Sequence, residues 1–460
     1  MNVLCFDIAT GGLTAALFNE KLEASRVIEK PWRIRLQPDG AAVLPVSVFE
    51  QAIFGIAAGI PADAIAFSAF MHSLVAVGDA GRPLTPIFTW MDTRGTGEVE
   101  RIRAEFGGDF HRRTGCRFHP MFPVFKLAAL RIPGVRRIAG AKAFAIAMLT
   151  GNWIEDHGTA SATGFYNIGK ADWDDDILRC IGVDRSSFLT LVERDRIVGY
   201  VTGEASSRFG VREGTPVVAG SGDGFLANLG SGCEDPSRFA ATLGTSASVR
   251  QILPCAVFDE TPGAFCYRAT MNSFLLGCAG SNGGNVLDWA RSTLGGLPTA
   301  QAKRIDLPAF IPHLHGERSP EWNPLLTARW EGVTAQHTRA DLAHAVLDGV
   351  VFNLAHYCEI LSAVSGRAPS QVVLSGNGFR APLTASTLAS VLDAQVLQPP
   401  DQGLASLRGA AICGFRALGV DVSAAPLLQS SKTVEPDNAD EVRFRCRRYR
   451  EFRSSGRSIK

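Results

Sequence analysis

Residues 3–29 read VLCFDIATGGLTAALFNEKLEASRVIE. Apolar runs at residues 3–8, 13–18 and 24–29 are separated by Gly-Gly and by Asn-Glu-Lys, which are turn signals. The pattern predicts three short strands joined in an antiparallel meander. Doubly wound α/β domains rarely open in this way, so the stretch indicates another kind of α/β architecture.

The order of predicted elements repeats along the chain. In the first half, strands are expected at residues 64–69 and 74–77 and helices at 95–106, 123–130 and 141–149. A second run of strand signals again precedes any long helix, at residues 215–219, 238–242, 247–252, 264–269 and 273–277. Helices are then expected at 282–292, 338–365, 381–392 and 404–418, with strands at 371–374 and 395–397. Two similar α/β halves with a seam near residue 220 fit this order.

Composition excludes several classes of protein. The chain has 460 residues, of which 46% are hydrophobic and 20% charged, so two to three globular domains are expected. Lys plus Arg is 46 and Asp plus Glu is 45, which leaves +1 and no electrostatic footprint for nucleic acid. No uncharged run reaches the roughly 18 residues of a membrane span, and the start resembles no leader peptide. Ten scattered cysteines without a CxxC pattern predict reduced thiols in a cytoplasmic protein.

Two turns have the composition of phosphate-binding loops, although the GxxxxGK[ST] motif is absent. They are DIATGG at residues 7–12 and TLGTS at residues 242–246, and each offers hydroxyls and backbone N–H groups after a strand. Asp7 ends its strand, where a carboxylate can hold Mg²⁺ or simply cap the turn. Hairpin turns of this composition are also common as structural elements.

Asp223 lies in GSGDG at residues 220–224, directly after a predicted buried strand. Glycines on both sides let a substrate and the backbone approach closely, so this acid is well placed to accept a hydroxyl proton.

The stretch QVVLSGNGFRA at residues 371–381 is a strand, a Gly-rich loop and a helix start, and it satisfies GxGxxA. A dinucleotide-binding domain is one interpretation. It is weakened because only one strand and one helix follow, and the acid expected about 20 residues later is at best Asp393 or Asp401. A loop that packs against an adenine is favoured.

Three segments mix donors, acceptors and aromatic rings, as sugar sites do: MHS at 71–73, WMDTR at 90–94 and HPMFPVFK at 119–126. HLHGE at residues 313–317 fits no zinc-ligand spacing, and a loop is expected there. The arginine-rich end, residues 443–457, is expected to be a solvated helix and not a nucleic-acid patch.

Together these segments resemble the FGGY carbohydrate kinase family, over about residues 1–425. The most specific match is ARWEGV at 328–333 with DL at 341–342 and AVLD at 345–348, which fits the family's C-terminal signature. The resemblance implies an α/β fold of the duplicated actin-like, ribonuclease-H-like ATPase type, with two domains around a cleft. It divides the chain into an N-terminal domain (1–220), a C-terminal domain (221–430) and a basic C-terminal segment (431–460).

The resemblance also implies roles for individual residues, with ATP and Mg²⁺ as cofactors. Asp223 resembles the catalytic base, and Asp7 with Asp223 would hold the metal. The positions expected to bind ATP are Asp7, Thr10, Gly11, Gly244, Thr245, Ser246, Gly376, Asn377, Gly378 and Arg380. The positions expected to line the sugar site are Met71, His72, Trp90, Asp92, Arg94, Lys126 and Asp223.

Within the family the sugar segments look most like those of gluconokinases, and Arg94 or Lys126 could supply a cation for an aldonate. A ketose or polyol kinase of the same family, or a non-catalytic ATP-binding sensor, are the alternatives. The family usually has Gly at Ala9, a hydroxyl residue at Gly12, Lys or Arg at Thr14, and Trp at Ala129. If position 9 needs positive φ, Ala there costs about 1–2 kcal/mol. A small-molecule sugar partner, no nucleic acid or membrane, and a homodimer are expected.

Overall fold

The computed structural model describes residues 1–56, 59–259 and 263–455. A six-stranded sheet organises the first half, and the meander predicted from residues 3–29 forms one side of it. Its strands, in spatial order, are β14 (Ile197–Tyr200), β15 (Pro216–Gly222), β6 (Ala64–Ala69), β1 (Asn2–Ala9), β2 (Gly12–Asn19) and β3 (Ala24–Pro31). β15, β6 and β1 run parallel, whereas β1, β2 and β3 are antiparallel.

A seven-stranded sheet repeats this plan in the second half. Its order is β18 (Phe265–Thr270), β19 (Ser273–Gly280), β17 (Ala247–Leu253), β16 (Arg238–Leu243), β22 (Gln371–Ser375), β23 (Gln395–Gln398) and β24 (Lys432–Thr433). β16, β22 and β23 are parallel, and β16, β17 and β19 are antiparallel, with β18 outside β19 at the edge of the sheet. Three parallel strands beside an antiparallel group therefore occur twice, and the predicted duplicated fold is confirmed.

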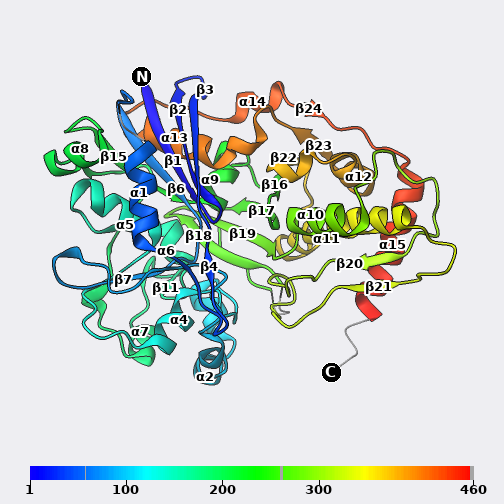
Figure 1. Ribbon diagram of the computed structural model, residues 1–460, viewed down its shortest axis with the longest axis horizontal. Coiled ribbons are helices and arrows are strands. Elements are labelled where there is room, and N and C mark those ends of the chain that lie inside the picture. The colour runs from blue at the N-terminus through cyan, green and yellow to red at the C-terminus, as the bar shows by residue number, and fades with distance from the viewer. Residues whose placement is uncertain (57–58, 260–262, 456–460) are drawn as a thin grey trace.

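Helices cover both faces of the first sheet because side chains along β1 point alternately to its two faces. Val3 and Cys5 pack with Leu226 of α9 (Asp223–Gly230) and Leu407 of α13 (Ala405–Ala417). Leu4, Phe6 and Ile8 pack toward α1 (Val46–Ile56), α5 (Ala141–Thr150) and α8 (Gly203–Phe209). In Figure 1 the orange α13 lies against the blue strands, so a late segment completes the first half's core.

The remaining helices and short strands surround these two sheets. The helices are α2 (Thr96–Phe106), α3 (Asp109–Thr114), α4 (Pro123–Leu130), α6 (His157–Ser161), α7 (Asp175–Ile181), α10 (Gly284–Leu294), α11 (Arg339–Ser365), α12 (Thr384–Val391), α14 (Ala425–Gln429) and α15 (Ala439–Ser455). The short strands are β4 (Arg35–Leu36), β5 (Ala42–Leu44), β7 (Val75–Val77), β8 (Ile87–Phe88), β9 (Arg137–Ala139), β10 (Ile154–Asp156), β11 (Tyr166–Asn167), β12 (Asp172–Trp173), β13 (Thr190–Val192), β20 (Ala309–Ile311) and β21 (Arg329–Glu331). Within the described ranges, no helix is both long and apolar enough to cross a bilayer.

The long helix α11 begins as its sequence predicts. Thr338 is the N-cap: its Oγ1 accepts the Asp341 backbone N–H at 3.3 Å, and its own N–H donates to the Asp341 carboxylate at 2.8 Å. This capping box satisfies two backbone donors at the helix start. Two other predicted helices begin later than expected: α10 starts at Gly284, and α12 starts at Thr384 after a 3₁₀ turn over Asn377–Arg380.

The arginine-rich C-terminal segment does form a helix, but the prediction that it is solvated was wrong for one face. Val442, Cys446 and Tyr449 of α15 pack against Ile311 and Phe352. Arg445 and Arg453 are also buried on this face, and Arg445 Nε is 2.6 Å from Asp348 Oδ2 of α11. Apolar residues three and four positions apart align on one helix face, and here that face docks on α11. Arg457 lies outside the described residues.

Replacing Arg445 with Met should lower the free energy of unfolding by about 3–5 kcal/mol, because Asp348 would keep a buried charge without its partner. Arg447 is exposed on the same helix, so Arg447→Met is the matched control and should change stability by less than about 0.5 kcal/mol. Urea unfolding followed by circular dichroism measures both. Equal effects of the two substitutions would contradict a structural role for the Arg445–Asp348 pair.

Candidate active site

Strand register brings Asp7 and Asp223 to one edge of the first sheet. Asp7 pairs with Ser68 across β1 and β6, and Ser68 pairs with Ser221 across β6 and β15. Asp223 follows Ser221 by two residues and is the first residue of α9. All three strands are parallel, so their carboxyl ends present both carboxylates on the same side. Asp7 accepts hydrogen bonds from Ser68 Oγ at 2.7 Å and, from α13, Ser406 Oγ at 2.8 Å.

The two carboxylates sense each other electrostatically. Burial and, second to it, the nearby Asp7 charge raise the pKa of Asp223 to about 6, against the opposing effects of Arg250, the Gly224 backbone N–H and Arg318. Burial also raises the pKa of Asp7, against the hydrogen bonds from the two serines. An Asp with a pKa near 6 is ionised at neutral pH yet basic enough to accept a proton in a transition state.

The first predicted phosphate-binding turn, at residues 7–12, is held by two tryptophans. Trp90 Nε1 donates to Thr10 Oγ1 and Trp32 Nε1 donates to the Thr10 carbonyl, each at 3.0 Å. Ala9 has an extended backbone and pairs with Gly12 in the ladder between β1 and β2. Position 9 therefore does not carry the strain that a positive φ would impose on an alanine. A Cβ at Gly12 would lie 2.8 Å from the Lys30 carbonyl oxygen of β3, which explains why no hydroxyl side chain is present there.

The second turn and the Gly-rich loop are brought together by the second sheet. Thr242 pairs with Ser375 across the parallel strands β16 and β22, and their hydroxyl oxygens are 2.7 Å apart. Gly376 has φ 90°, and a Cβ there would lie 2.5 Å from the Leu243 carbonyl oxygen. The loop therefore packs directly on the turn. Gly244, Thr245 and Ser246 lie on one side of this contact, with Gly378 and the exposed Asn377 and Arg380 on the other.

The segment with Met71 and His72, which is predicted to line the sugar site, lies beside Asp223. A Cβ at Gly222 would lie 2.6 Å from Met71 Cγ, and one at Gly224 would lie 2.9 Å from Met71 Cε, so Met71 spans the glycines that flank Asp223. His72 has φ 65°, an uncommon conformation for a residue with a side chain, and such residues concentrate at functional sites. Its Nδ1 lies 2.6 Å from the Ala162 carbonyl oxygen, and burial lowers its pKa to about 3. The ring is therefore neutral.

Arg94 and Lys126, the two cations predicted to bind the carboxylate of an aldonate, already have partners within the protein. The Arg94 guanidinium grips the fully buried Asp92, with Nη2 at 2.7 Å and Nε at 3.1 Å from its oxygens. The ammonium of Lys126 is buried and donates to the carbonyl oxygens of Thr89 and Met121, both at 2.6 Å, and of His72 at 3.2 Å. Burial lowers the pKa of Lys126 to about 7, although the nearby Asp92 carboxylate favours the charged form. No ammonium hydrogen is left for a ligand, so we propose a positioning role for Lys126.

Two buried arginines near Asp223 were missed by the sequence analysis. Arg250 of β17 donates to Asn228, Ser248 and Thr242 at 3.1, 2.6 and 2.5 Å. Arg318 follows Glu317, and its Cζ lies 4.5 Å from the centre of the Trp90 ring. Neither has a local motif that would mark it, because each reaches the site only through the tertiary fold.

The oxygen ligands offered by Asp7 and Asp223 suit Mg²⁺, which is usually bound through one or two carboxylates while keeping waters and substrate phosphates. In the part of the chain that is described, no group of three or more His, Cys, Asp or Glu side chains is arranged to hold a metal ion. The two carboxylates thus fit a metal shared with a phosphate ligand rather than a closed protein site. In the HLHGE segment, where no zinc site was predicted, His313 and Glu317 are buried, and the distance between His313 Nε2 and Glu317 Oε2 is 3.8 Å.

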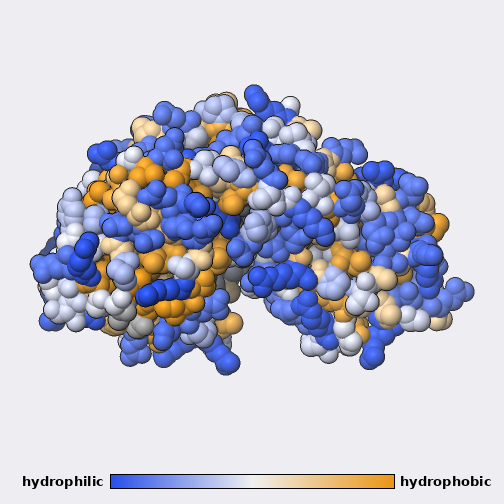
Figure 2. Space-filling model, turned by 90° about the horizontal axis from the view of Figure 1, so that it is seen from above, coloured by the Kyte–Doolittle hydropathy of each residue, from blue (hydrophilic) through white to orange (hydrophobic). Residues whose placement is uncertain are grey.

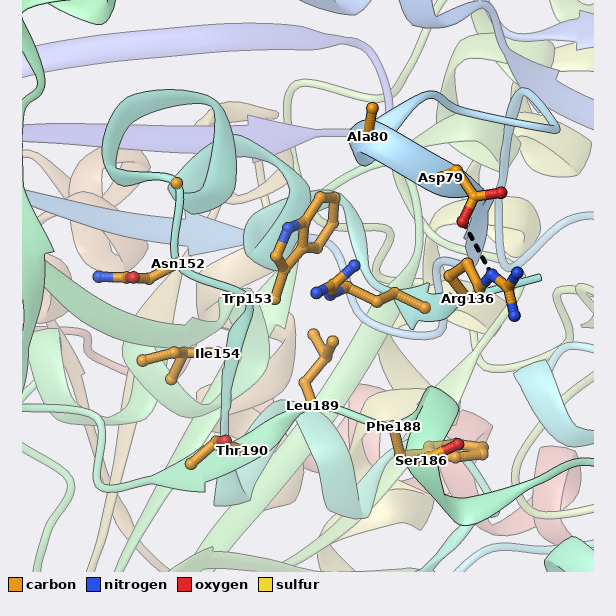
Figure 3. A pocket seen from close by; sticks show the side chains of 12 residues that line it. Asp79, Ala80, Arg136, Asn152, Trp153, Ile154, Ser186, Phe188, Leu189 and Thr190 are labelled. Atoms are coloured by element: carbon orange, nitrogen blue, oxygen red, sulfur yellow. Dashed lines mark hydrogen bonds and ion pairs between the residues drawn. The ribbon is translucent and has the colours of Figure 1, made fainter.

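The molecule has more than one hollow. The space-filling view shows the surface indented between the left and right parts that hold the two sheets (Figure 2). A separate pocket of about 730 Å³ lies in the first half (Figure 3). There Arg136 is paired with Asp79 at 2.9 Å, and Arg137 lies over the Trp153 ring. None of the predicted site residues lines this pocket, so it is separate from the Asp7–Asp223 site.

Comparison with known proteins places the chain among carbohydrate kinases. Residues 47–230 match the model of the FGGY family of carbohydrate kinases, N-terminal domain, and residues 206–418 match the C-terminal domain of that family. A gluconokinase from Bacillus subtilis (strain 168) is 30% identical over 381 residues, which cover 77% of this chain and 74% of that protein.

Two solved structures share the fold. A gluconate kinase from Lactobacillus acidophilus has a TM-score of 0.90 and 24% identity, covering 100% of this chain and 98% of that chain. A ligand-bound xylulose kinase from the same organism has a TM-score of 0.91 and 24% identity, covering 100% and 99%.

The raised pKa of Asp223 predicts how the stability of the folded protein depends on pH. A carboxyl whose pKa rises on folding loses stabilisation as pH increases from its unfolded value near 3.8 through about 6. Asp223→Asn cannot ionise, so it should melt a few degrees higher than the wild type at pH 7.5 and lose this advantage at pH 4. Asp235 is the matched control, because a backbone hydrogen bond from Ser237 lowers its pKa, and Asp235→Asn should not raise the melting temperature. A lower melting temperature for Asp223→Asn at pH 7.5 would contradict the assigned shift.

Proposed function

Since the chain belongs to the FGGY family of carbohydrate kinases, we propose that it transfers the γ-phosphoryl group of ATP to the primary hydroxyl of D-gluconate, an open-chain sugar acid. The observation that carries the chemistry is the Asp7–Asp223 pair at the carboxyl ends of parallel strands. The choice of a sugar acid is supported by the similarity to a gluconokinase and by two buried arginines close to Asp223.

In the proposed reaction Asp223 accepts the proton of the sugar hydroxyl. The hydroxyl oxygen attacks the γ-phosphorus, and the bond to the β–γ bridging oxygen breaks as ADP leaves. Because such transfers need little covalent assistance, positioning and charge stabilisation supply most of the catalysis. Thr10 and Gly11 on one side and Gly244, Thr245 and Ser246 on the other would hold phosphate oxygens. Gly376, Asn377, Gly378 and Arg380 would pack on the adenine.

Asp7, with Asp223, would hold Mg²⁺, and the metal would neutralise the charge of the phosphates. Met71 and the neutral ring of His72 would contact the sugar beside Asp223. Trp90 joins the sugar segment to the phosphate turn, because its Nε1 donates to Thr10 Oγ1. Closure of the two halves would exclude water, which would otherwise compete as acceptor.

A second candidate is phosphorylation of a ketose such as D-xylulose. The similarity of the fold to a xylulose kinase, with a TM-score of 0.91, favours it. The pairing of Arg94 with Asp92 also leaves that part of the sugar segment without net charge, which suits a neutral substrate.

The substrate is tested by ADP release from Mg-ATP with D-gluconate, other aldonates, D-xylulose, L-ribulose and glycerol. We expect D-gluconate to give the highest kcat/KM. Asp223→Asn serves as the blank, and its turnover should be lower by roughly 10²–10⁴-fold because the base is lost. A preference for D-xylulose would keep the mechanism and replace the substrate. ATP binding with no turnover on any of these compounds would favour a nucleotide sensor.

The acid limb of the pH profile should belong to Asp223. With a pKa of about 6, the base is mostly ionised above pH 7 and mostly protonated at pH 5, so kcat/KM for the sugar should be level above about pH 7, about half at pH 6 and about tenfold lower at pH 5. Steady-state rates between pH 5 and 8 at saturating Mg-ATP give the profile. The residual activity of Asp223→Asn should lack this limb. A wild-type profile that stays level down to pH 5 would remove Asp223 from the role of base.

A further inference from the structure

We infer that Arg318 binds the carboxylate of the sugar acid and sets the preference for an acid over a neutral sugar. This inference rests on the proposed function and names the group that recognises its substrate. Arg318 thereby takes the role in carboxylate recognition that the sequence suggested for Arg94 or Lys126.

Arg318 is a buried cation with unused donors. Its side chain is almost wholly enclosed, with a residue exposure of 8%. Nη2 donates to the Gly280 carbonyl oxygen at the end of β19, whereas Nε is buried and has no hydrogen-bond partner. Among residues 1–56, 59–259 and 263–455, no carboxylate oxygen lies within 4.0 Å of the guanidinium, since no ion pair of Arg318 is found there. A buried cation without a partner is costly, and a bound anion would relieve that cost.

The neighbouring carboxylate does not meet this need. Glu317 Oε1 accepts the backbone N–H groups of Ser281 and Arg318, at 2.6 and 2.9 Å, and Oε2 accepts Asn282 Nδ2 at 3.3 Å. Burial raises the pKa of Glu317 to about 7, so it is partly protonated at neutral pH. Glu317 thus fixes the backbone of the turn while the Arg318 guanidinium extends away toward Trp90.

The other cations near the site are already engaged. Arg94 is paired with Asp92 through two nitrogens, and the ammonium of Lys126 is surrounded by three carbonyl oxygens. Each of the three nitrogens of the Arg250 guanidinium donates to a side-chain oxygen. Arg318 is therefore the cation of this cluster with free capacity for the two-pronged contact that guanidinium groups make with carboxylates.

The surroundings of Arg318 place it on the sugar side of Asp223. Its positive charge lowers the pKa values of His72 and His119, which belong to the sugar-like segments, and also that of Asp223. Its guanidinium stacks on Trp90, whose indole also reaches Thr10. An open-chain acid with its terminal hydroxyl at Asp223 would therefore have a cation available to its other end. The same cation could instead meet a phosphate oxygen, and the experiment separates these two anions.

The test compares D-gluconate with D-gluconamide, which keeps the chain length and every hydroxyl but has no charge. The wild type should prefer D-gluconate in kcat/KM by roughly 10–100-fold, the range expected for a hydrogen-bonded charge contact. The rates are compared at pH 8, where Asp223 stays ionised when the Arg318 charge is removed. In Arg318→Gln this preference should vanish because KM for D-gluconate rises, while kcat/KM for D-gluconamide changes little. The retained activity on D-gluconamide also shows that the variant is folded. Arg318→Lys keeps the charge without the fork and should give an intermediate preference.

Arg94→Gln is the matched control, because Arg94 is an arginine of the same site with a carboxylate partner. Its ratio of the two kcat/KM values should stay at the wild-type value. Loss of the preference in Arg94→Gln but not in Arg318→Gln would overturn the inference. So would an equal loss on both substrates in Arg318→Gln, which is the result expected of a phosphate contact, or a wild type that treats the two compounds alike. If the wild type phosphorylates neither, the proposed function itself fails, and that outcome is recognised before any variant is made.

Discussion

The repulsion between two carboxylates at one sheet edge is the constraint on which the site depends. Asp7 and Asp223 are brought together by the parallel pairing of β1, β6 and β15, and no local sequence feature could achieve this. Burial and the Asp7 charge both make ionised Asp223 costly, so the site must contain compensating positive charge. Arg250 and Arg318 supply part of it from the second half of the chain, and a divalent cation shared with phosphate would supply the rest. The duplicated fold is thus needed electrostatically as well as geometrically.

A second charged network lies beneath this edge and supports β15. Lys142 of α5 is buried, with Nζ 2.8 Å from Glu155 and 3.0 Å from Asp156. Asp156 Oδ2 in turn accepts Ser221 Oγ at 2.5 Å, two residues before Asp223. The Lys142 charge and the Ser221 hydrogen bond lower the pKa of Asp156 despite its burial. Breaking one of these buried ion pairs would leave an uncompensated charge, so the network resists rearrangement. The strand that carries Asp223 is therefore anchored by hydrogen bonds from its own half.

Sequence patterns predicted the features that depend on local spacing. The meander, the capping box at Thr338 and the two turns all follow from short-range composition. Predictions from sequence patterns failed where the role of a residue depends on its neighbours in the tertiary structure. Lys126 resembles a ligand-binding cation in sequence, yet it fills a cage of carbonyl oxygens. Arg445 resembles its exposed neighbour Arg447, yet the docking of α15 buries it. Arg318 gave no signal at all, because its unused donors become apparent only when its surroundings are known.

The unusual first turn also gains a physical explanation. Gly12 faces the Lys30 carbonyl oxygen of β3 at a distance that leaves no room for a side chain, so the close approach of the third strand excludes the usual hydroxyl. A turn without that hydroxyl and without a cation at Thr14 offers less to a phosphate from the first half. Positive charge beside the phosphates would then have to come from a bound divalent cation, which leaves the turn bearing Arg318 for the sugar acid. That turn is held in part by α15, because Arg453 pairs with Glu321 and donates to Asn353 of α11 at 2.6 Å. The C-terminal helix, although distant in sequence from every phosphate turn, thereby helps to place the cation that faces Asp223.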